Sequence, residues 1–257
     1  MPEPLFTRTY DRLPVEIYQD NETLGQAAAA QAGTLLSNIL AVKPAANLIV
    51  ATGNSQLTFY RSLVSLAGID WGRVRIFHMD EYVGMRQDHP ASFRRFLHEK
   101  LVDCVHPAEF FGVNGNAPDP LAECARYSDL LRRYPADLVC LGIGENGHIA
   151  FNDPPFADFQ DRAWVKVVQL DSRSRQQQVG EGHFALLDEV PTHAITLTIP
   201  ALLAAQAMLA IVPERRKNEA VQKALAGPIT TTCPASILRT ASHARLYLDL
   251  ESASLIL

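Results

Sequence analysis

Short apolar runs alternate along the chain with longer amphipathic stretches. The apolar runs predict strands at residues 45–51, 74–79, 137–144, 164–170, 194–199, 207–212 and 245–250. The amphipathic stretches predict helices at residues 21–40, 56–67, 89–102, 120–133 and 214–225, with a polar helix or turn at residues 172–180. Apolar runs of this length are typical of strands that are buried on both faces of a sheet. The pattern therefore predicts an α/β fold, a Rossmann-like, doubly wound and mostly parallel sheet with helices on both faces.

The composition favours a globular enzyme or binding protein. Hydrophobic residues make up 47% of the 257 residues and charged residues 20%, a balance that argues against disorder. No linker, repeat or shift in composition divides the sequence, so we expect a single domain over residues 1–257. No apolar run approaches the roughly 20 residues that a membrane helix needs, and the N-terminus lacks the apolar core of a signal peptide. We expect a cytoplasmic protein with no membrane contact.

Charge and cysteine usage argue against other classes of protein. The formal net charge is −5, and Lys and Arg are scattered apart from residues 215–217, so we expect no nucleic-acid partner. A small anionic ligand is still compatible with this distribution. The four cysteines show no C-x-x-C spacing and no paired histidines, which argues against a zinc site and a disulfide scaffold. We expect all four to be buried free thiols.

Residues 139–155, with the sequence VCLGIGENGHIAFNDPP, form the first candidate site. An apolar run leads to two glycines, after which polar side chains follow closely, namely Glu145, Asn146, His148, Asn152 and Asp153. Ligands of α/β proteins bind outside the carboxyl ends of parallel strands, so a buried strand that leads into such a loop indicates a site. His148 and Asp153 are five residues apart, a spacing that fits a loop better than one helix face. His148 is either a group for proton transfer or a structural hydrogen-bonding residue of the loop.

A second candidate site follows the strand at residues 45–51. It consists of four small or polar residues, Thr52, Gly53, Asn54 and Ser55, and a predicted helix begins directly after them. In this arrangement backbone N–H groups and the start of a helix can bind a phosphate. Many turns between a strand and a helix use Gly and Ser only to form the corner, so both interpretations stay open.

Charged residues follow two other strands. Asp80 and Glu81 come after the strand at residues 74–79, where burial would raise the pKa of at least one carboxyl and provide a base near neutral pH. A helix cap or a solvated turn is the alternative for this pair. Residues 215–217, with the sequence RRK, either reach back to the carboxyl edge of the sheet or form a solvated basic turn.

Together these segments resemble the glucosamine-6-phosphate deaminase family, within the wider group that includes 6-phosphogluconolactonases. The matching segments follow one order over most of the chain: TGNS at 52–55, FHMDEYVG at 77–84, HPASF at 89–93, NGNAPD at 114–119, GENGHIAFNDP at 144–154, and Lys217. The 6-phosphogluconolactonases are less similar, because their corresponding loop usually reads GHTAS where this chain has GHIAF at 147–151.

The resemblance implies that a 2-amino-sugar 6-phosphate is converted to a ketose phosphate with release of ammonia, without a metal or a cofactor. Asp80 would be the base that moves a proton between C2 and C1 of the sugar. His148 would shuttle a proton at the ring oxygen, held in place by Asn146 and Asp153. The phosphate would be bound by Thr52, Gly53, Asn54, Ser55 and Lys217.

Three positions depart from the pattern of the family. Asn146 stands where many members have Asp, and Asp153 stands where Glu is typical, one methylene longer. Arg175 matches one arginine of the family, but the second, which binds the phosphate, has no counterpart in the segment SRQQQVGEGHF at 174–184. These departures keep open a galactosamine-6-phosphate isomerase, a 6-phosphogluconolactonase and a non-catalytic sugar-phosphate sensor. Whether the chain forms a homo-oligomer is also open.

Overall fold

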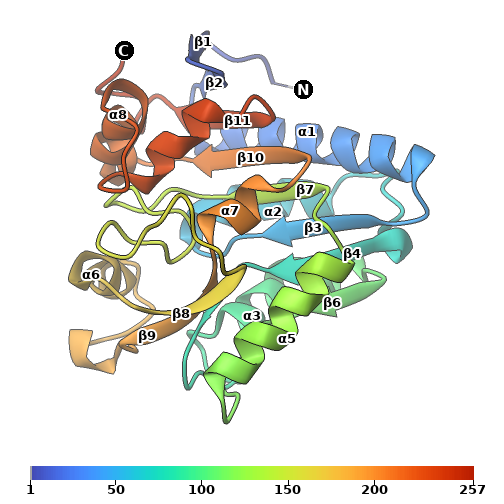
Figure 1. Cartoon of the computed structure of the whole chain (residues 1–257). Helices are drawn as coiled ribbons and strands as arrows, with labels where there is room; N and C mark the ends of the chain where they lie inside the picture. The colour runs from blue at the N-terminus through green and yellow to red at the C-terminus, as the bar shows by residue number, and fades with distance from the viewer. Residues whose placement is uncertain (1) are drawn as a thin grey trace.

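A computed structural model describes residues 2–257, and its centre is an eight-stranded sheet (Figure 1). From one edge to the other the strands are β1 (Phe6–Tyr10), β2 (Leu13–Tyr18), β11 (Ala244–Asp249), β10 (Ala207–Val212), β7 (Leu138–Leu141), β3 (Ala46–Val50), β4 (Val74–His78) and β6 (Glu109–Phe111). Neighbours are parallel throughout except for the β1–β2 hairpin at one edge. The predicted mostly parallel sheet is confirmed, with the β1–β2 hairpin and β6 as additions that the hydrophobic pattern did not predict.

Helices cover both faces of this sheet because its central strands are apolar on both sides. On β3, Leu48 and Val50 belong to one hydrophobic core and Ile49 to the other. The helices that pack into the first core are α1 (Asn21–Val42), α2 (Leu57–Val64) and α3 (Phe93–Leu97). Those that pack into the second core are α5 (Pro120–Arg133), α7 (Ile199–Leu203) and α8 (Asn218–Ala226). The predicted doubly wound arrangement follows from this alternation.

A second, three-stranded sheet corrects one sequence-based expectation. The strands predicted at residues 164–170 and 194–199 exist, as β8 (Val165–Gln169) and β9 (His193–Leu197), but they lie outside the parallel sheet. They pair in antiparallel fashion with each other and, through β9, with β5 (Asp80–Tyr82). Because β5 follows β4 after one residue, the chain passes directly from the large sheet to the small one. Apolar runs do not reveal which sheet a strand joins.

The helix predicted at residues 89–102 is also different in the structure. Its first regular turn begins only at α3, where the Ser92 hydroxyl accepts a hydrogen bond from the Arg95 N–H at 3.3 Å. The helix then widens into a π-helical turn, His98–Val102, and ends in α4 (Asp103–Val105). The N-cap serine therefore determines where this helix starts, rather than the preceding proline.

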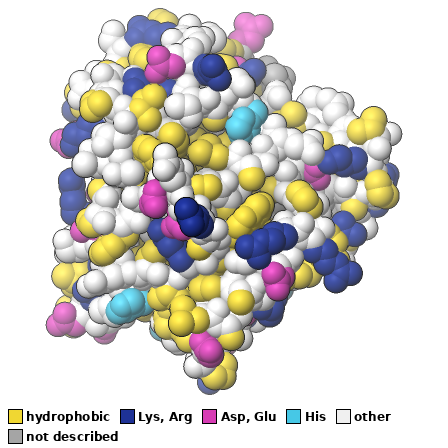
Figure 2. All heavy atoms as spheres, in the orientation of Figure 1, with side chains coloured by type: hydrophobic (Ala, Val, Ile, Leu, Met, Phe, Trp, Pro, Cys, Tyr) yellow, Lys and Arg dark blue, Asp and Glu magenta, His cyan; other side chains and the backbone are white. Residues whose placement is uncertain are grey.

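Other side chains are distributed as expected for a globular chain, with one exception. Cys124, Cys140 and Cys233 are buried free thiols, whereas Cys104 is exposed, so the prediction of four buried thiols was wrong for Cys104. Cys104 lies in α4, on a short turn at the surface. On the face shown in Figure 2, Lys and Arg side chains are interrupted by acidic, apolar and uncharged groups. Among the helices of residues 2–257, none combines the length and apolarity needed to cross a membrane.

Candidate active site

Four loops meet at the carboxyl edge of the parallel sheet. They follow β3, β4, β7 and β10, which are neighbours in the order β10-β7-β3-β4. From β3 the chain adds β4 on one side and later β7 on the other, so the crossovers diverge between β3 and β7. A ligand cleft is expected at such a switch point of an α/β sheet.

A cleft with an empty volume of about 570 Å³ lies at this switch point, including space open to solvent. Its wall contains residues from all four loops and from α6 (Ser172–Gly180) with the turn after it. The polar and charged side chains among them are Thr52, Ser55, Asp80, His148, Gln177, Gln178, Glu181 and Lys217. Within residues 2–257, no three His, Cys, Asp or Glu side chains are grouped in a way that would hold a metal ion.

Asp80 brings a buried carboxyl group to the cleft. It begins β5 directly beyond the end of β4, and it is only 7% exposed. Burial, and secondarily the nearby charge of Glu81, raises the pKa of Asp80 to about 8. The carboxylate can therefore accept a proton readily at a pH close to neutral.

Glu81, the next residue, has a structural role. Its Oε2 accepts hydrogen bonds from the Ser92 hydroxyl at 2.8 Å and the Arg94 N–H at 3.0 Å, and its Oε1 accepts from the Tyr82 N–H at 3.0 Å. Burial raises the pKa of Glu81, and these donors act in the opposite direction. The interpretation as a helix cap thus applies to Glu81, which holds the start of α3. The interpretation as a base stays a prediction for Asp80, which faces the cleft.

His148 lies in the cleft with its Nδ1 2.9 Å from Asp153 Oδ1. Asp153 is fully buried, and although burial acts to raise its pKa, contacts with His148, Asn146 and Ser174 lower that pKa to about 2. An ionised carboxylate accepts hydrogen bonds only, so it selects the tautomer in which Nδ1 carries the proton. The other ring nitrogen, Nε2, is then free to take up a proton.

Ser174 completes this arrangement, and the sequence analysis did not predict it. Its hydroxyl lies 2.5 Å from Asp153 Oδ1 and 3.0 Å from His148 Nδ1. Asp153 Oδ2 also accepts a hydrogen bond from the Asp171 N–H at 3.0 Å. Both carboxylate oxygens are thereby fixed, and Asp153 contacts His148 directly although its side chain is short.

Asn146 links the backbone of His148 to the Asp153 carboxylate, and Gly144 leaves room for the His148 ring. Asn146 Nδ2 donates to Asp153 Oδ1 at 2.9 Å, and Asn146 Oδ1 accepts from the His148 N–H at 3.0 Å. An amide can make both contacts because it carries a donor and an acceptor, whereas an ionised Asp cannot. A Cβ added to Gly144 would lie 2.1 Å from His148 Cε1, so only glycine leaves room for the ring.

The loop at residues 52–55 forms part of the wall of the cleft. Thr52, Gly53 and Ser55 line it, and Gly53 adopts a left-handed φ of 103°. A short 3-10 turn (Asn54–Gln56) then leads into α2. Asn54 does not line the cleft, because its side chain turns towards the backbone carbonyl of Glu181 and donates to it at 3.2 Å.

Lys217 brings a buried ammonium group to the same cleft. It ends a 3-10 turn (Arg215–Lys217) after β10, lines the cleft and is 3% exposed. Burial lowers the pKa of Lys217 to about 8, although Glu181 acts to raise it. The basic turn thus does reach the edge of the sheet through Lys217, while Arg215 is exposed.

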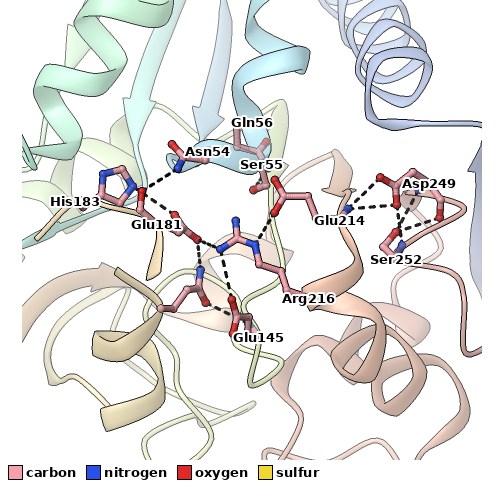
Figure 3. A network of polar contacts seen from close by, with 11 residues as sticks. Asn54, Ser55, Gln56, Glu145, Glu181, His183, Glu214, Arg216, Asp249 and Ser252 are labelled. Atoms are coloured by element: carbon pink, nitrogen blue, oxygen red, sulfur yellow. Dashed lines mark hydrogen bonds and ion pairs between the residues drawn. The ribbon is translucent and has the colours of Figure 1, made fainter. Parts of the chain in front are cut away.

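Three more residues of the cleft, Gln177, Gln178 and Glu181, come from α6 and the turn after it, and the sequence analysis did not predict them. Figure 3 shows Glu181 facing Arg216 beneath Asn54 and Ser55. Arg216 Nη1 lies 2.8 Å from Glu181 Oε1 and 3.4 Å from Glu145 Oε1, and its Nε contacts Glu214. In the sequence this segment is only polar and rich in Gln, which does not reveal that some of its side chains are buried.

The predicted site residues thus fall into three groups. Those that line the cleft are Thr52, Gly53, Ser55, Asp80, His148 and Lys217. Asp153 contacts the imidazole, and Asn146 holds Asp153 and the backbone N–H of His148. The side chain of Asn54 faces the turn after α6.

Comparison with known proteins gives consistent results. The family model described as "Glucosamine-6-phosphate isomerases/6-phosphogluconolactonase" matches residues 19–248. A protein of Exiguobacterium sibiricum named glucosamine-6-phosphate deaminase is 39% identical over 209 residues, which cover 80% of each chain. A protein of Bacillus pumilus with the same name is 35% identical over 246 residues, covering 93% of this chain and 98% of that protein.

Solved structures extend this comparison. A monomeric glucosamine-6-phosphate deaminase superposes with a TM-score of 0.87 at 34% identity, covering 94% of this chain and 99% of the other. A 6-phosphogluconolactonase from Shewanella baltica OS155 has a TM-score of 0.76 at 20% identity, over 94% and 97% of the two chains, which is a likeness of fold. The match of the family model over most of the chain, together with relatives above 30% identity, shows that this chain belongs to the glucosamine-6-phosphate isomerase/6-phosphogluconolactonase family.

Proposed function

We propose that this protein is an isomerising deaminase that converts glucosamine 6-phosphate and water to fructose 6-phosphate and ammonia. One observation carries the proposal: the Asp80 carboxyl and the His148 ring line a single cleft, together with Lys217 and the loop at residues 52–55. The resemblance of the sequence and the names of the relatives at 35–39% identity support the same reaction.

His148 acts first, on the closed sugar ring. Its unprotonated Nε2 takes the proton of the C1 hydroxyl and delivers a proton to the ring oxygen, which opens the ring to the aldehyde. Asp153 stabilises the imidazolium that forms between these two transfers, because it lies 2.9 Å from Nδ1. Asn146 and Ser174 keep this carboxylate in place through the hydrogen bonds described above.

Asp80 then moves a proton between two carbons. Its carboxylate takes the proton from C2, which leaves an enol-type intermediate once O1 has gained a proton. Return of the C2 proton to C1 makes C2 an iminium, and the nitrogen then gives up one proton to replace the one that O1 took, so that C2 becomes an imine. Addition of water at C2 and loss of the amino group release ammonia and leave the ketone. The raised pKa of about 8 suits both halves of this step, because the group must accept the proton and give it back.

The far end of the substrate provides binding energy for orientation. In this proposal the phosphate lies against Thr52, Gly53, Ser55 and Lys217, remote from the carbons that react. Binding energy from a remote group can hold C1 and C2 in register with Asp80 and His148. Asn54, which turns away from the cleft, contributes through its contact with the turn after α6.

The test is to incubate pure protein with glucosamine 6-phosphate and to follow ammonia and fructose 6-phosphate, with hydrolysis of 6-phosphogluconolactone as a parallel reaction. We expect equal amounts of both products from the amino sugar and no turnover by Asp80→Asn. Rapid loss of the lactone without ammonia would identify a lactonase instead. Binding of the sugar phosphate without either reaction would identify a sensor, and galactosamine 6-phosphate as the preferred substrate would change the epimer.

A further inference from the structure

Glu181 places a negative charge in the wall of the cleft, beside Gly53. Its side chain is 4% exposed, and its Oε2 would lie 3.9 Å from a Cβ added to Gly53. Burial acts to raise its pKa, but contacts with His183, Arg216 and Gln177 lower that pKa to about 2, so Glu181 is ionised. The carboxylate therefore stands beside the loop that would receive a phosphate.

Three neighbours hold Glu181 in this position (Figure 3). Gln177 Nε2 donates to its Oε1 at 2.7 Å, Arg216 Nη1 lies 2.8 Å from the same oxygen, and His183 Nε2 lies 3.3 Å from Oε2. Arg216 is not part of the wall of the cleft, and it is shared with Glu145 and Glu214. The single charge of Arg216 is thus shared among three carboxylates and does not fully offset that of Glu181.

Within the wall of the cleft, Lys217 is the only Lys or Arg among residues 2–257, and Glu181 adds a carboxylate of opposite charge to the same wall. A phosphate dianion in this cleft would be attracted by Lys217 and repelled by Glu181. The side-chain charges of the wall therefore contribute little net attraction for a dianion, in contrast to a site that collects several cations around a phosphate.

Gln178 adds to the same wall an acceptor that has no partner in the described part of the chain. It is 7% exposed and lines the cleft, and its buried Oε1 has no hydrogen-bond partner in the described part of the chain. Such a group needs a donor from a ligand, because an unsatisfied buried acceptor is unfavourable. A phosphate dianion has only acceptors, whereas a hydroxyl can donate to Gln178 or Glu181 and accept from Lys217.

We propose that Glu181 is a specificity-determining residue that opposes a phosphate dianion in the cleft, so that the enzyme also accepts amino sugars with a free hydroxyl at that position. This inference rests on the proposed function, because it concerns the substrate class of the same site. It predicts a modest preference for glucosamine 6-phosphate over glucosamine, and a larger preference once the charge of Glu181 is removed.

The experiment compares the wild type with Glu181→Gln at pH 7.0, where Lys217 keeps its charge. Gln is isosteric, and its carbonyl oxygen can still accept from Gln177 and Arg216. Calorimetry with inorganic phosphate should give a Kd at least roughly tenfold lower for Glu181→Gln than for the wild type, since one like charge is removed from a buried site. The ratio of kcat/KM for glucosamine 6-phosphate over glucosamine should rise by a similar factor, mainly through KM of the phosphorylated sugar.

The matched control is Glu214→Gln, which removes another carboxylate that contacts Arg216 but lies outside the wall of the cleft. We expect its Kd for inorganic phosphate to stay within about twofold of the wild type, because its charge is farther from the ligand. An equal gain in both variants would overturn the inference, since the effect would then come from a freed Arg216. The double variant Glu181→Gln, Arg216→Gln should bind inorganic phosphate more tightly than Arg216→Gln alone. Equal Kd values for these two variants would also refute the role of Glu181.

The phosphate titration does not depend on catalysis, so the two proposals can fail separately. Absence of ammonia from both sugars would refute the deaminase function, while tighter phosphate binding by Glu181→Gln would still support repulsion by Glu181. Conversely, ammonia release with an unchanged or higher Kd in Glu181→Gln would leave the deaminase function intact and overturn the assignment of Glu181.

Discussion

Replacement of Asp80 by Asn should make the protein more stable while it abolishes catalysis. In the folded state the Asp80 pKa is raised to about 8 from its ordinary value of 3.8, because the carboxyl is buried and lies near Glu81. The folded protein therefore binds a proton at Asp80 more tightly than the unfolded chain does. Between these two pKa values the stability of the wild type falls as the pH rises.

The magnitude follows from the pKa difference. Each pH unit above the unfolded pKa corresponds to about 1.4 kcal/mol, so the proton that Asp80 must take up on folding lowers the stability by up to roughly 4 kcal/mol at pH 7. Part of this effect belongs to the Asp80–Glu81 pair, and we expect Asp80→Asn to raise the free energy of unfolding by about 2–4 kcal/mol at pH 7 and about 1 kcal/mol at pH 5.

Urea denaturation of the wild type and of Asp80→Asn at several pH values from 5 to 8 would measure this difference. Asp188→Asn, at an exposed position on the short turn Leu187–Glu189, provides the control and should show no difference that grows with pH. A variant that is less stable than the wild type at pH 7, or a difference that is constant across the range, would refute the reasoning. The buried carboxylate would then be stabilised by contacts that the structure does not contain.

Three further predictions concern activity. The pH profile of kcat/KM should be a narrow bell centred near pH 8. Asp80 must lose its proton on the acidic side and Lys217 loses its charge on the basic side, each with a pKa of about 8. A flat profile on the acidic side would contradict the raised pKa of Asp80. Gly144→Ala should lower kcat/KM by roughly 100-fold by displacing the His148 ring, whereas Gly180→Ala, where a Cβ meets nothing within 4 Å, should stay near wild type. Ser174→Ala should lower kcat by roughly tenfold and leave KM nearly unchanged, because it removes one buried hydrogen bond behind His148; an equal loss in the binding of inorganic phosphate would instead indicate general damage to α6.

Elements that are defined by local signals were predicted well from the sequence. The helix at residues 120–133 has the predicted bounds, because Asp119 caps its start by accepting from the N–H groups of Leu121 and Ala122, and proline occupies the first turn. The strand Ala207–Val212 was likewise predicted from its continuous apolar run. The boundaries of such helices and strands are determined by residues close to them in the sequence.

Elements that depend on distant partners were not predicted. The β1–β2 hairpin has an outer strand whose residues are mostly exposed, so it lacks the apolar run that marks a buried strand. The strand Asp80–Tyr82 has three residues and exists through its pairing with β9. Glu181 is similar, because its role comes from Arg216 and Gly53, which are far away in the sequence.

The contact between His148 and Asp153 shows the same limit within one loop. A spacing of five residues left their distance open, and the structure brings them together by a tight reversal of the backbone. Ala150 adopts a left-handed φ of 50°, and Ile149 pairs with Asn152 in an antiparallel bridge. A residue other than glycine in this conformation is uncommon and gives no sign in the sequence. The surrounding contacts, such as that of the Phe151 N–H with the Thr196 hydroxyl, hold it in place.

The two carboxyl groups at residues 80 and 81 show how one short strand gives adjacent residues opposite tasks. Successive side chains of a strand point to opposite faces, so β5 directs Asp80 into the cleft and Glu81 towards the start of α3. Glu81 finds backbone and hydroxyl donors there and can act as a fixed acceptor. Asp80 faces the space where a substrate would bind, so its charge is opposed by burial and by Glu81 until a proton arrives. The same alternation that makes β5 part of a sheet thereby separates a structural carboxylate from a candidate base.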